Sequence, residues 1–206
     1  MKADPDSTYT KESLLTLYKN AFPDLPNPPM NGKEWKDLGF QSENPYSDLR
    51  SGGKLSLENI VYFSDHYQAM FAKMVKEAHD YPFVASAINL TTLLLIHLRI
   101  STQFTFCPCC GTSFKQEKRV PAKEMVAFAS LLQDCSGETV FNELYSLSVM
   151  LMDHNYWKHV ETEPTFTILE FRKVFVDTKE QIMAILRKSP RTITDVFDIA
   201  KVYLDK

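Results

Sequence analysis

The stretch WKDLGFQSENPYSDLRSGGKLSLENIVYF, residues 35–63, decides how this chain is organised. It begins with a short aromatic-rich segment, passes through a polar turn and a glycine pair, and continues into an amphipathic pattern. Arg50 lies at the centre of the turn, close to Asp48. The planar guanidinium of an arginine presents five donors in a fixed fork, which suits a phosphate or a carboxylate. The alternative is a local salt bridge from Arg50 to Glu43 or Asp48, because structural ion pairs are common.

The composition is that of an ordinary soluble globular protein, with 206 residues, 44% hydrophobic and 24% charged. A net charge of −3 without a basic stripe excludes a nucleic-acid partner. No GxxxxGK, GxSxG or HExxH motif occurs, so the chain shows no self-contained catalytic site. The polar first residues carry neither a signal-peptide nor a lipidation pattern. We therefore expect a cytoplasmic protein that meets membranes only through a partner.

Apolar spacing predicts an all-α fold, a single compact domain of about eight helices, because glycine is scarce and the apolar runs are long. Thr10 is expected to cap a helix that runs to Ala21, and a proline-rich segment follows it. This divides the chain into an N-terminal helix and proline-rich arm at residues 1–32 and a helical domain at residues 33–206. Further helices are expected at residues 57–80, 82–100, 121–133, 138–157 and 166–188, and from a cap at Thr194 onward. The residues expected to face the core include Met70, Met125, Phe128, Ala129, Leu132 and Ile168.

The helix expected at residues 82–100 is apolar on nearly every side. A membrane span of that length is excluded because polar residues interrupt the apolar run, among them Asn89, His97 and Arg99. We therefore predict a central helix buried on most sides. A histidine on such a face is more often a hydrogen-bonded core residue than a ligand, so His97 is interpreted as part of the core.

Three of the four cysteines lie in the pentapeptide CPCCG, residues 107–111. The turn Cys-Pro-x-Cys-Gly is the one that zinc knuckles use to present two thiolates on one side of a loop. A closed zinc site needs four ligands, and His79 and His97 lie upstream. The alternative is a group of reduced thiols in a surface loop, with no cofactor. The candidate zinc ligands are Cys107, Cys109, Cys110 and Cys135.

The stretch at residues 35–63 also resembles the signature of the ELMO (engulfment and cell motility) domain. That signature reads Trp, three residues, Gly-Phe-Gln, three residues, Pro, one residue, Thr-Asp-Phe-Arg-Gly, one residue and Gly, followed by leucines. The chain departs from it mildly, and Ser51 matters most, because a glycine there would let the backbone approach a ligand more closely. The other departures are Ser47, Leu49 and Ile60. The matching positions are Trp35, Gly39, Phe40, Gln41, Pro45, Asp48, Arg50, Gly53 and Leu57.

The resemblance implies a regulator of small GTPases. Small ELMO-domain proteins are similar in acting as GTPase-activating proteins for Arf and Arf-like GTPases, and the arginine that matches Arg50 is their proposed arginine finger. The chain is then expected to bind a GTP-bound Arf-family GTPase, which would recruit it to endomembranes. The larger ELMO scaffolds lack this arginine and act with DOCK-family exchange factors. The alternative is therefore a non-catalytic binding module or scaffold for a small GTPase or a DOCK-type exchange factor.

Around Arg50, we expect Gln41, Asp48, Ser51 and Gly53 to orient the loop or to contact the partner. Asp48 would set the side-chain conformation of Arg50, and Gln41 would hydrogen-bond the loop. Two roles are open for Trp35 and Phe40, together with the aromatic residues that follow them. They form either a hydrophobic docking surface or a core that anchors the loop, and the second is favoured because aromatic residues at helical spacing usually pack inward.

Overall fold

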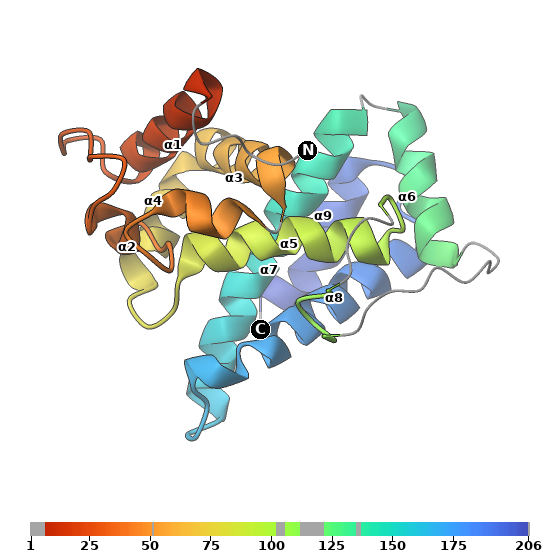
Figure 1. Cartoon of the computed structure of the whole chain (residues 1–206). Coiled ribbons are helices and arrows are strands. Elements are labelled where there is room, and N and C mark those ends of the chain that lie inside the picture. Colours follow the sequence, from red (N-terminus) through yellow and green to blue (C-terminus); the bar gives the residue numbers. More distant parts are fainter. Residues whose placement is uncertain (1–6, 51, 102–105, 112–121, 135–136, 206) are drawn as a thin grey trace. The chain divides into compact units, whose positions relative to one another are not determined.

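The computed structural model describes residues 7–50, 52–101, 106–111, 122–134 and 137–205. Within these ranges the protein is helical and has no strand, and eight of its helices contain ten residues or more (Figure 1). The predicted all-α class and number of helices are thus confirmed. The chain divides into two units, residues 1–91 and 92–206. The division at residue 32 expected from the sequence stays a prediction.

Unit 1 is built around α1, which packs against α3 and α4. The predicted cap at Thr10 is wrong, because α1 begins two residues earlier, with Ser7 at the N-cap position, and Thr10 is buried within the helix. The elements are α1 (Thr8–Ala21), α2 (Glu34–Asp37), η1 (Pro45–Arg50), α3 (Gly53–His66), α4 (Gln68–Glu77) and the first part of α5 (Phe83–His97). The core includes Leu14, Leu17, Trp35, Leu57, Ile60, Phe63 and Phe71.

The helix expected from Leu57 to about residue 80 is in fact two helices, α3 and α4. Tyr67 interrupts it with φ −123° and ψ 40°, outside the helical region. The change of direction keeps both Phe63 and Phe71 in the core, with ring centroids 6.2 Å apart. It also turns Met70, which was expected inward, to the surface, where it is 40% exposed.

The helix α5 is buried along almost its whole length, as predicted. Residues 83–96 are buried except Asn89, which is half-buried and donates its amide to the Ala85 carbonyl at 3.1 Å. Asn59 of α3 donates to the Thr91 hydroxyl at 2.9 Å, and both side chains are fully buried. Among the described residues, no helix combines the length and the apolar character that a membrane crossing requires.

Unit 2 is organised around α8, which contacts α6, α7 and α9. In Figure 1, α8 (blue) runs beside α7 (cyan). The elements are the end of α5, α6 (Lys123–Asp134), α7 (Gly137–Thr162), η2 (Ile168–Glu170), α8 (Arg172–Arg187) and α9 (Ile193–Leu204). The core includes Leu131, Val140, Leu144, Tyr145, Leu151, Val174, Ile182 and Leu186.

Two expectations for unit 2 are wrong: the residue at which α8 begins and the face of α6 that is buried. The helix predicted from residue 166 begins only at Arg172, because Thr167 is extended (φ −136°, ψ 167°) and a short 3₁₀ turn follows it. Ile168, expected inward, is therefore 41% exposed. In α6 the buried face is rotated, so that Ala127 and Leu131 face the core while Ala129 is exposed.

The start of α9 gives a testable prediction about helix capping. Thr192, rather than the expected Thr194, caps this helix: its hydroxyl accepts the Asp195 amide, and the Asp195 carboxylate accepts the Thr192 amide, both at 3.1 Å. We expect Thr192→Ala to lower the free energy of unfolding by about 1 kcal/mol, because the box satisfies two amides at the helix start. Thr194→Ala, at an exposed position, should change it by less than about 0.5 kcal/mol. Urea denaturation of both variants checks this, and equal losses would contradict the assignment of the cap.

Candidate functional site

The Arg50 loop, defined here as residues 39–53, connects α2 to α3 in unit 1. Its second half is the 3₁₀ helix η1, whose Pro45 and Leu49 are buried. Arg50 is the last residue of η1 and its side chain is exposed. Ser51 lies outside the described residues, so its expected role is not addressed by the structure. The loop therefore presents Arg50 from a short element whose apolar side chains are anchored in the core.

The Arg50 side chain is held by the loop backbone. Its Nε donates to the Ser47 carbonyl at 2.8 Å. In the described part of the chain, no ion pair joins Arg50 to Glu43 or Asp48, and no partner is recorded for the two Nη atoms. The guanidinium is thus held at Nε, while the residue as a whole is exposed. A negatively charged group of a partner can be bound there without breaking an internal ion pair.

Asp48 closes the loop on itself. Its carboxylate accepts the backbone amide of Gln41 at 2.9 Å, which links the two halves of the loop. Burial raises the pKa of Asp48, although the Gln41 amide and the charge of Arg50 act in the opposite direction. Gln41 therefore holds the loop through its main chain, while its side chain is exposed. Within the described residues the Asp48 carboxylate accepts from the loop and forms no ion pair with the guanidinium, so it acts on Arg50 through its charge and by fixing the loop.

A second set of hydrogen bonds shapes the turn before η1, and sequence reasoning missed it. The Asn44 side chain accepts the Tyr46 amide at 3.1 Å, the pattern of an Asx turn. The hydroxyls of Ser42 and Ser47 lie 2.9 Å apart, and Ser47 also reaches the Asn44 carbonyl at 2.9 Å. The signal was present in the sequence, because serine and asparagine just before a proline favour a turn.

Trp35 and Phe40 anchor the loop from inside. Trp35 is 0% exposed and Phe40 is 3% exposed, with their rings edge to face at 5.8 Å. The Tyr18 ring of α1 also packs against Trp35, with the ring centroids 5.8 Å apart. The indole Nε1 donates to the Pro29 carbonyl at 2.8 Å, which ties the proline-rich arm to α2. Side chains buried to this degree form a core and cannot present a docking surface.

The signature glycines are required by the backbone. Gly39 has φ +99°, and a Cβ atom built there would lie 2.9 Å from the amide nitrogens of Phe83 and Val84. Its carbonyl accepts the Ala85 amide at 3.0 Å, in the first turn of α5. Gly53, the buried first residue of α3, has φ +63°. Both glycines therefore position the Arg50 loop. Gly39 holds it against the start of α5, and Gly53 connects it to the start of α3.

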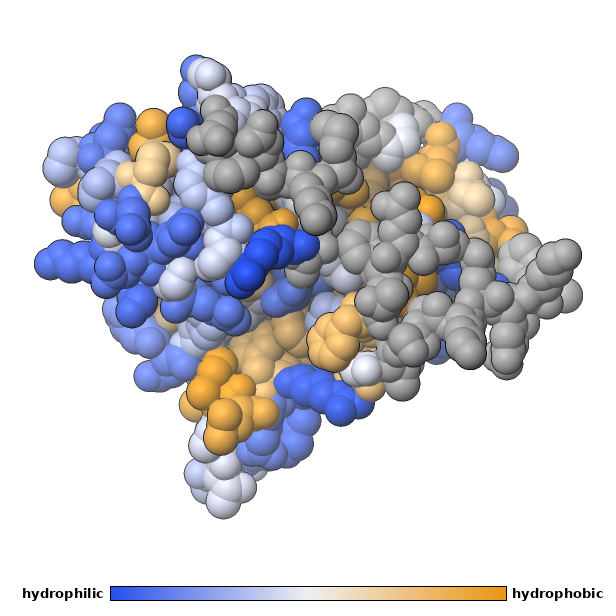
Figure 2. Space-filling view, in the orientation of Figure 1, coloured by the Kyte–Doolittle hydropathy of each residue, from blue (hydrophilic) through white to orange (hydrophobic). Residues whose placement is uncertain are grey.

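A hollow of about 470 Å³ lies beside the Arg50 loop, and residues from α2, the loop and the α4–α5 connection line it. Phe40 and Gln41 belong to its wall, together with the charged or polar side chains of Lys36, Asp37 and His79. Figure 2 shows that the surface over α2 and the segment after it is mainly hydrophilic. The hollow therefore carries charged side chains of both signs, although Arg50 itself does not line it.

The predicted cysteine ligands are only partly brought together. The sulfurs of Cys107 and Cys109 lie 3.1 Å apart, and His97, expected to be a core residue, joins them. Cys110 is not part of this group, and Cys135 lies outside the described residues. The hydrogen bond from Cys109 lowers the pKa of Cys107 to about 3, whereas that same bond and burial raise the pKa of Cys109. The Cys107 thiol therefore loses its proton more readily than the Cys109 thiol.

Comparison with known proteins places the chain in a family. The profile described as "ELMO/CED-12 family" matches residues 1–175. The chain belongs to the ELMO/CED-12 family. It is 28% identical over 174 residues to ELMO domain-containing protein B of Dictyostelium discoideum, covering 83% of this chain and 51% of that protein. It is 29% identical over 169 residues to Engulfment and cell motility protein 3 of Mus musculus, covering 78% of this chain and 20% of that protein. The chain therefore spans about half or less of the length of these relatives.

Proposed function

We propose that this ELMO-family protein stimulates GTP hydrolysis by a small GTPase of the Arf or Arf-like type, and that Arg50 acts as an arginine finger supplied in trans. The observation that supports this is the presentation of Arg50. It is exposed at the end of η1, held at Nε by the Ser47 carbonyl, and carried by a loop that Trp35 and Asp48 brace. A finger needs this combination, because the guanidinium must project while its backbone stays fixed.

The chemistry follows from the demands of phosphoryl transfer. Little covalent work is left to the protein, and the barrier falls when positive charge meets the equatorial oxygens of the transferred phosphoryl group. The two Nη nitrogens of Arg50 could donate to two of these oxygens at once, as a planar fork. The protein would act on its partner's reaction and would hold no nucleotide of its own.

A second candidate is a binding module that recognises the GTP-bound partner without accelerating hydrolysis, or a scaffold for a DOCK-type exchange factor. It is favoured by the similarity to Engulfment and cell motility protein 3, which is as strong as the similarity to the ELMO domain-containing proteins. Both candidates require binding that depends on the nucleotide. Only the first requires that hydrolysis become faster.

The experiment that separates them is single-turnover hydrolysis of GTP by a panel of Arf and Arf-like GTPases, with and without this chain in excess. We expect at least one GTPase to be accelerated by about 10³-fold or more. A Rho-family GTPase serves as the control and should not respond. Binding to the GTP-loaded form of a panel member, combined with an unchanged rate, would contradict the activator role and leave the binding module.

A further inference from the structure

The end of α5 and the segment carrying residues 106–111 bring three metal-binding side chains together in unit 2. The Nε2 atom of His97 lies 3.3 Å from the Cys107 sulfur and 3.2 Å from the Cys109 sulfur, and the two sulfurs are 3.1 Å apart. Both cysteines are buried, with exposures of 0% and 1%, whereas His97 is half-buried. Two soft sulfurs and one imidazole nitrogen therefore converge on one point below the surface.

We propose that His97, Cys107 and Cys109 form a binding site for a single zinc ion, which we call the Cys-His site. Thiolate and imidazole are the ligands that zinc prefers, and zinc bound to cysteine and histidine is usually tetrahedral. Bonds of about 2.3 Å to sulfur and about 2.0 Å to nitrogen place such ligand atoms roughly 3.5–3.8 Å apart. The His97 nitrogen, at 3.3 and 3.2 Å, is slightly too close to the two sulfurs, and the sulfurs, at 3.1 Å, must separate by about 0.7 Å, which side-chain rotations of the two cysteines can supply.

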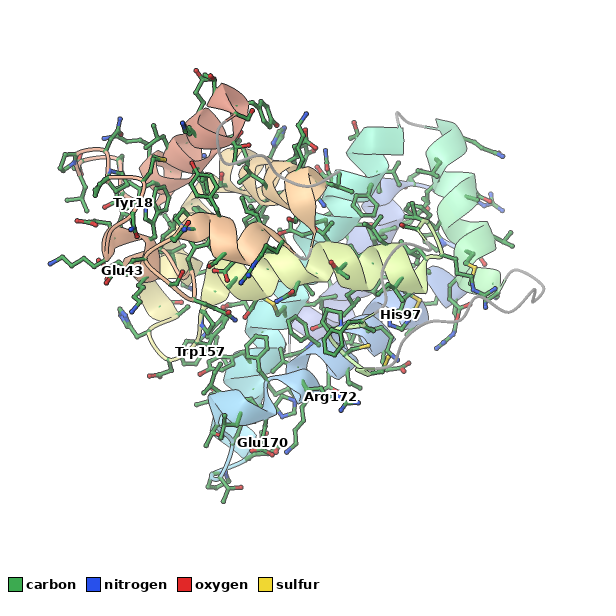
Figure 3. All side chains as sticks on the ribbon, viewed as in Figure 1. Tyr18, Glu43, His97, Trp157, Glu170 and Arg172 are labelled. Atoms are coloured by element: carbon green, nitrogen blue, oxygen red, sulfur yellow. The ribbon has the colours of Figure 1, made fainter. Side chains whose placement is uncertain are left out.

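The segment that carries the two cysteines is already fixed in position. The Gly111 amide donates to the Cys107 carbonyl at 2.8 Å and closes a turn around Pro108. Arg172, at the start of α8, donates from Nε to the Cys109 carbonyl at 2.7 Å and from Nη2 to the Cys110 carbonyl at 2.8 Å. His97 and Arg172 are labelled in Figure 3, on α5 and α8. A loop held in this way loses little conformational freedom when it binds an ion, which favours affinity.

Zinc at this position would connect the end of α5, through the segment that carries the cysteines, to α8, which is distant in the sequence. His97 ends α5, and the cysteines follow ten and twelve residues later on a segment that Arg172 attaches to α8. The ion would fasten the connection between α5 and α6 to the end of α5 and so add to the stability of unit 2. This role does not depend on Arg50 or on any GTPase.

The test uses the full chain, expressed with added zinc and purified without chelator. Metal analysis should give about one zinc per chain. Cys107→Ser, Cys109→Ser and His97→Ala should each reduce the zinc content at least tenfold. Cys110→Ser is the matched control, because Cys110 lies in the same turn but outside the cluster, and it should keep the zinc. After chelation and exchange into cobalt(II), the protein should show thiolate-to-cobalt charge-transfer and tetrahedral d–d absorption bands, which Cys110→Ser retains and His97→Ala alters.

A stability measurement keeps the proposal testable if a cysteine variant does not fold. Removing the metal from the unmodified chain should lower Tm by roughly 5–10 °C, and adding back zinc should restore it, because a ligand that binds only the folded state stabilises it. The proposal is overturned if the purified chain contains no zinc and does not take it up. It is also overturned if its intact mass without reductant shows a disulfide between Cys107 and Cys109, or if Cys110→Ser loses as much zinc as Cys107→Ser.

Discussion

Replacing Arg50 by alanine should abolish GTPase activation and leave the fold unchanged. Its side chain is exposed and, among the described residues, its hydrogen bond goes to the Ser47 carbonyl, so its loss removes little that holds unit 1 together. In the proposed complex, however, it supplies charge to the transferring phosphoryl group. A finger of this kind contributes a rate factor on the order of 10³–10⁵, or about 4–7 kcal/mol of barrier. Single-turnover hydrolysis with the responsive GTPase and a thermal melt of the variant together test both halves of this expectation.

Three further variants distinguish a guanidinium that acts in chemistry from a positive charge that acts in binding. Arg50→Lys keeps the charge but loses the planar fork, so it should lose most of the activation. Asp48→Ala removes the acceptor of the Gln41 amide and loosens the loop, so the activation should fall by a smaller factor. Lys36→Ala removes an exposed cation from the neighbouring hollow and should have little effect on the rate. A stable Arg50→Ala protein that still activates fully would refute the finger and leave a binding module.

Replacing Trp35 by alanine should be the most destabilising single change in unit 1. The side chain is 0% exposed, packs between Tyr18 and Phe40, and donates to the Pro29 carbonyl. Truncation leaves a large cavity and removes the hydrogen bond to Pro29, and truncation of a buried tryptophan costs about 3–5 kcal/mol. Because α2 supports the Arg50 loop, the loop should lose its anchor as well. Urea denaturation followed by circular dichroism measures the loss.

The chain contains a matched control for this change. Trp157, the other of its two tryptophans, is only half-buried on α7, in unit 2, and Trp157→Ala should cost clearly less than Trp35→Ala. Trp35→Phe retains most of the apolar volume but loses the hydrogen bond to Pro29. Its loss of unfolding free energy should therefore lie between those of Trp157→Ala and Trp35→Ala. An unchanged midpoint for Trp35→Ala would contradict the role of the aromatic cluster as the anchor of the loop.

The elements that could be predicted from the sequence are those whose pattern is local. The helix at residues 83–97 was predictable because almost every position is apolar, and the turn around Arg50 because its glycines and proline are strong signals. The interruption at Tyr67 was not predictable, because the apolar period continues through it. On either side of it, Phe63 and Phe71 still contact each other within one core. The late start of α8 was not predictable either. Thr167 is extended, and Ile168 lies in the short 3₁₀ helix η2 instead of in α8.

In the candidate sites, too, residues that lie close together in the sequence could be predicted, whereas contacts between distant residues could not. Arg50, Asp48 and Gln41 could be selected because they lie close together in the sequence and match the ELMO signature. The contact of the Asp48 carboxylate with the Gln41 amide could not be foreseen, since main-chain partners leave no mark in the sequence. His97 was assigned to the core from its apolar surroundings, and only the folded chain places it against Cys107 and Cys109.

The contact between Gly39 and Ala85 has a consequence for local unfolding. The first amides of a helix have no partner within that helix, and here the main-chain carbonyl of Gly39 serves the Ala85 amide. If the Arg50 loop opens, the first turn of α5 loses this acceptor, so fraying of α5 and release of the loop belong to one cooperative event. The free energy of that event sets how often the arginine leaves its presented position. In the proposed complex with a GTPase, the main-chain contact at Gly39 would therefore set the fraction of molecules that present Arg50 for binding.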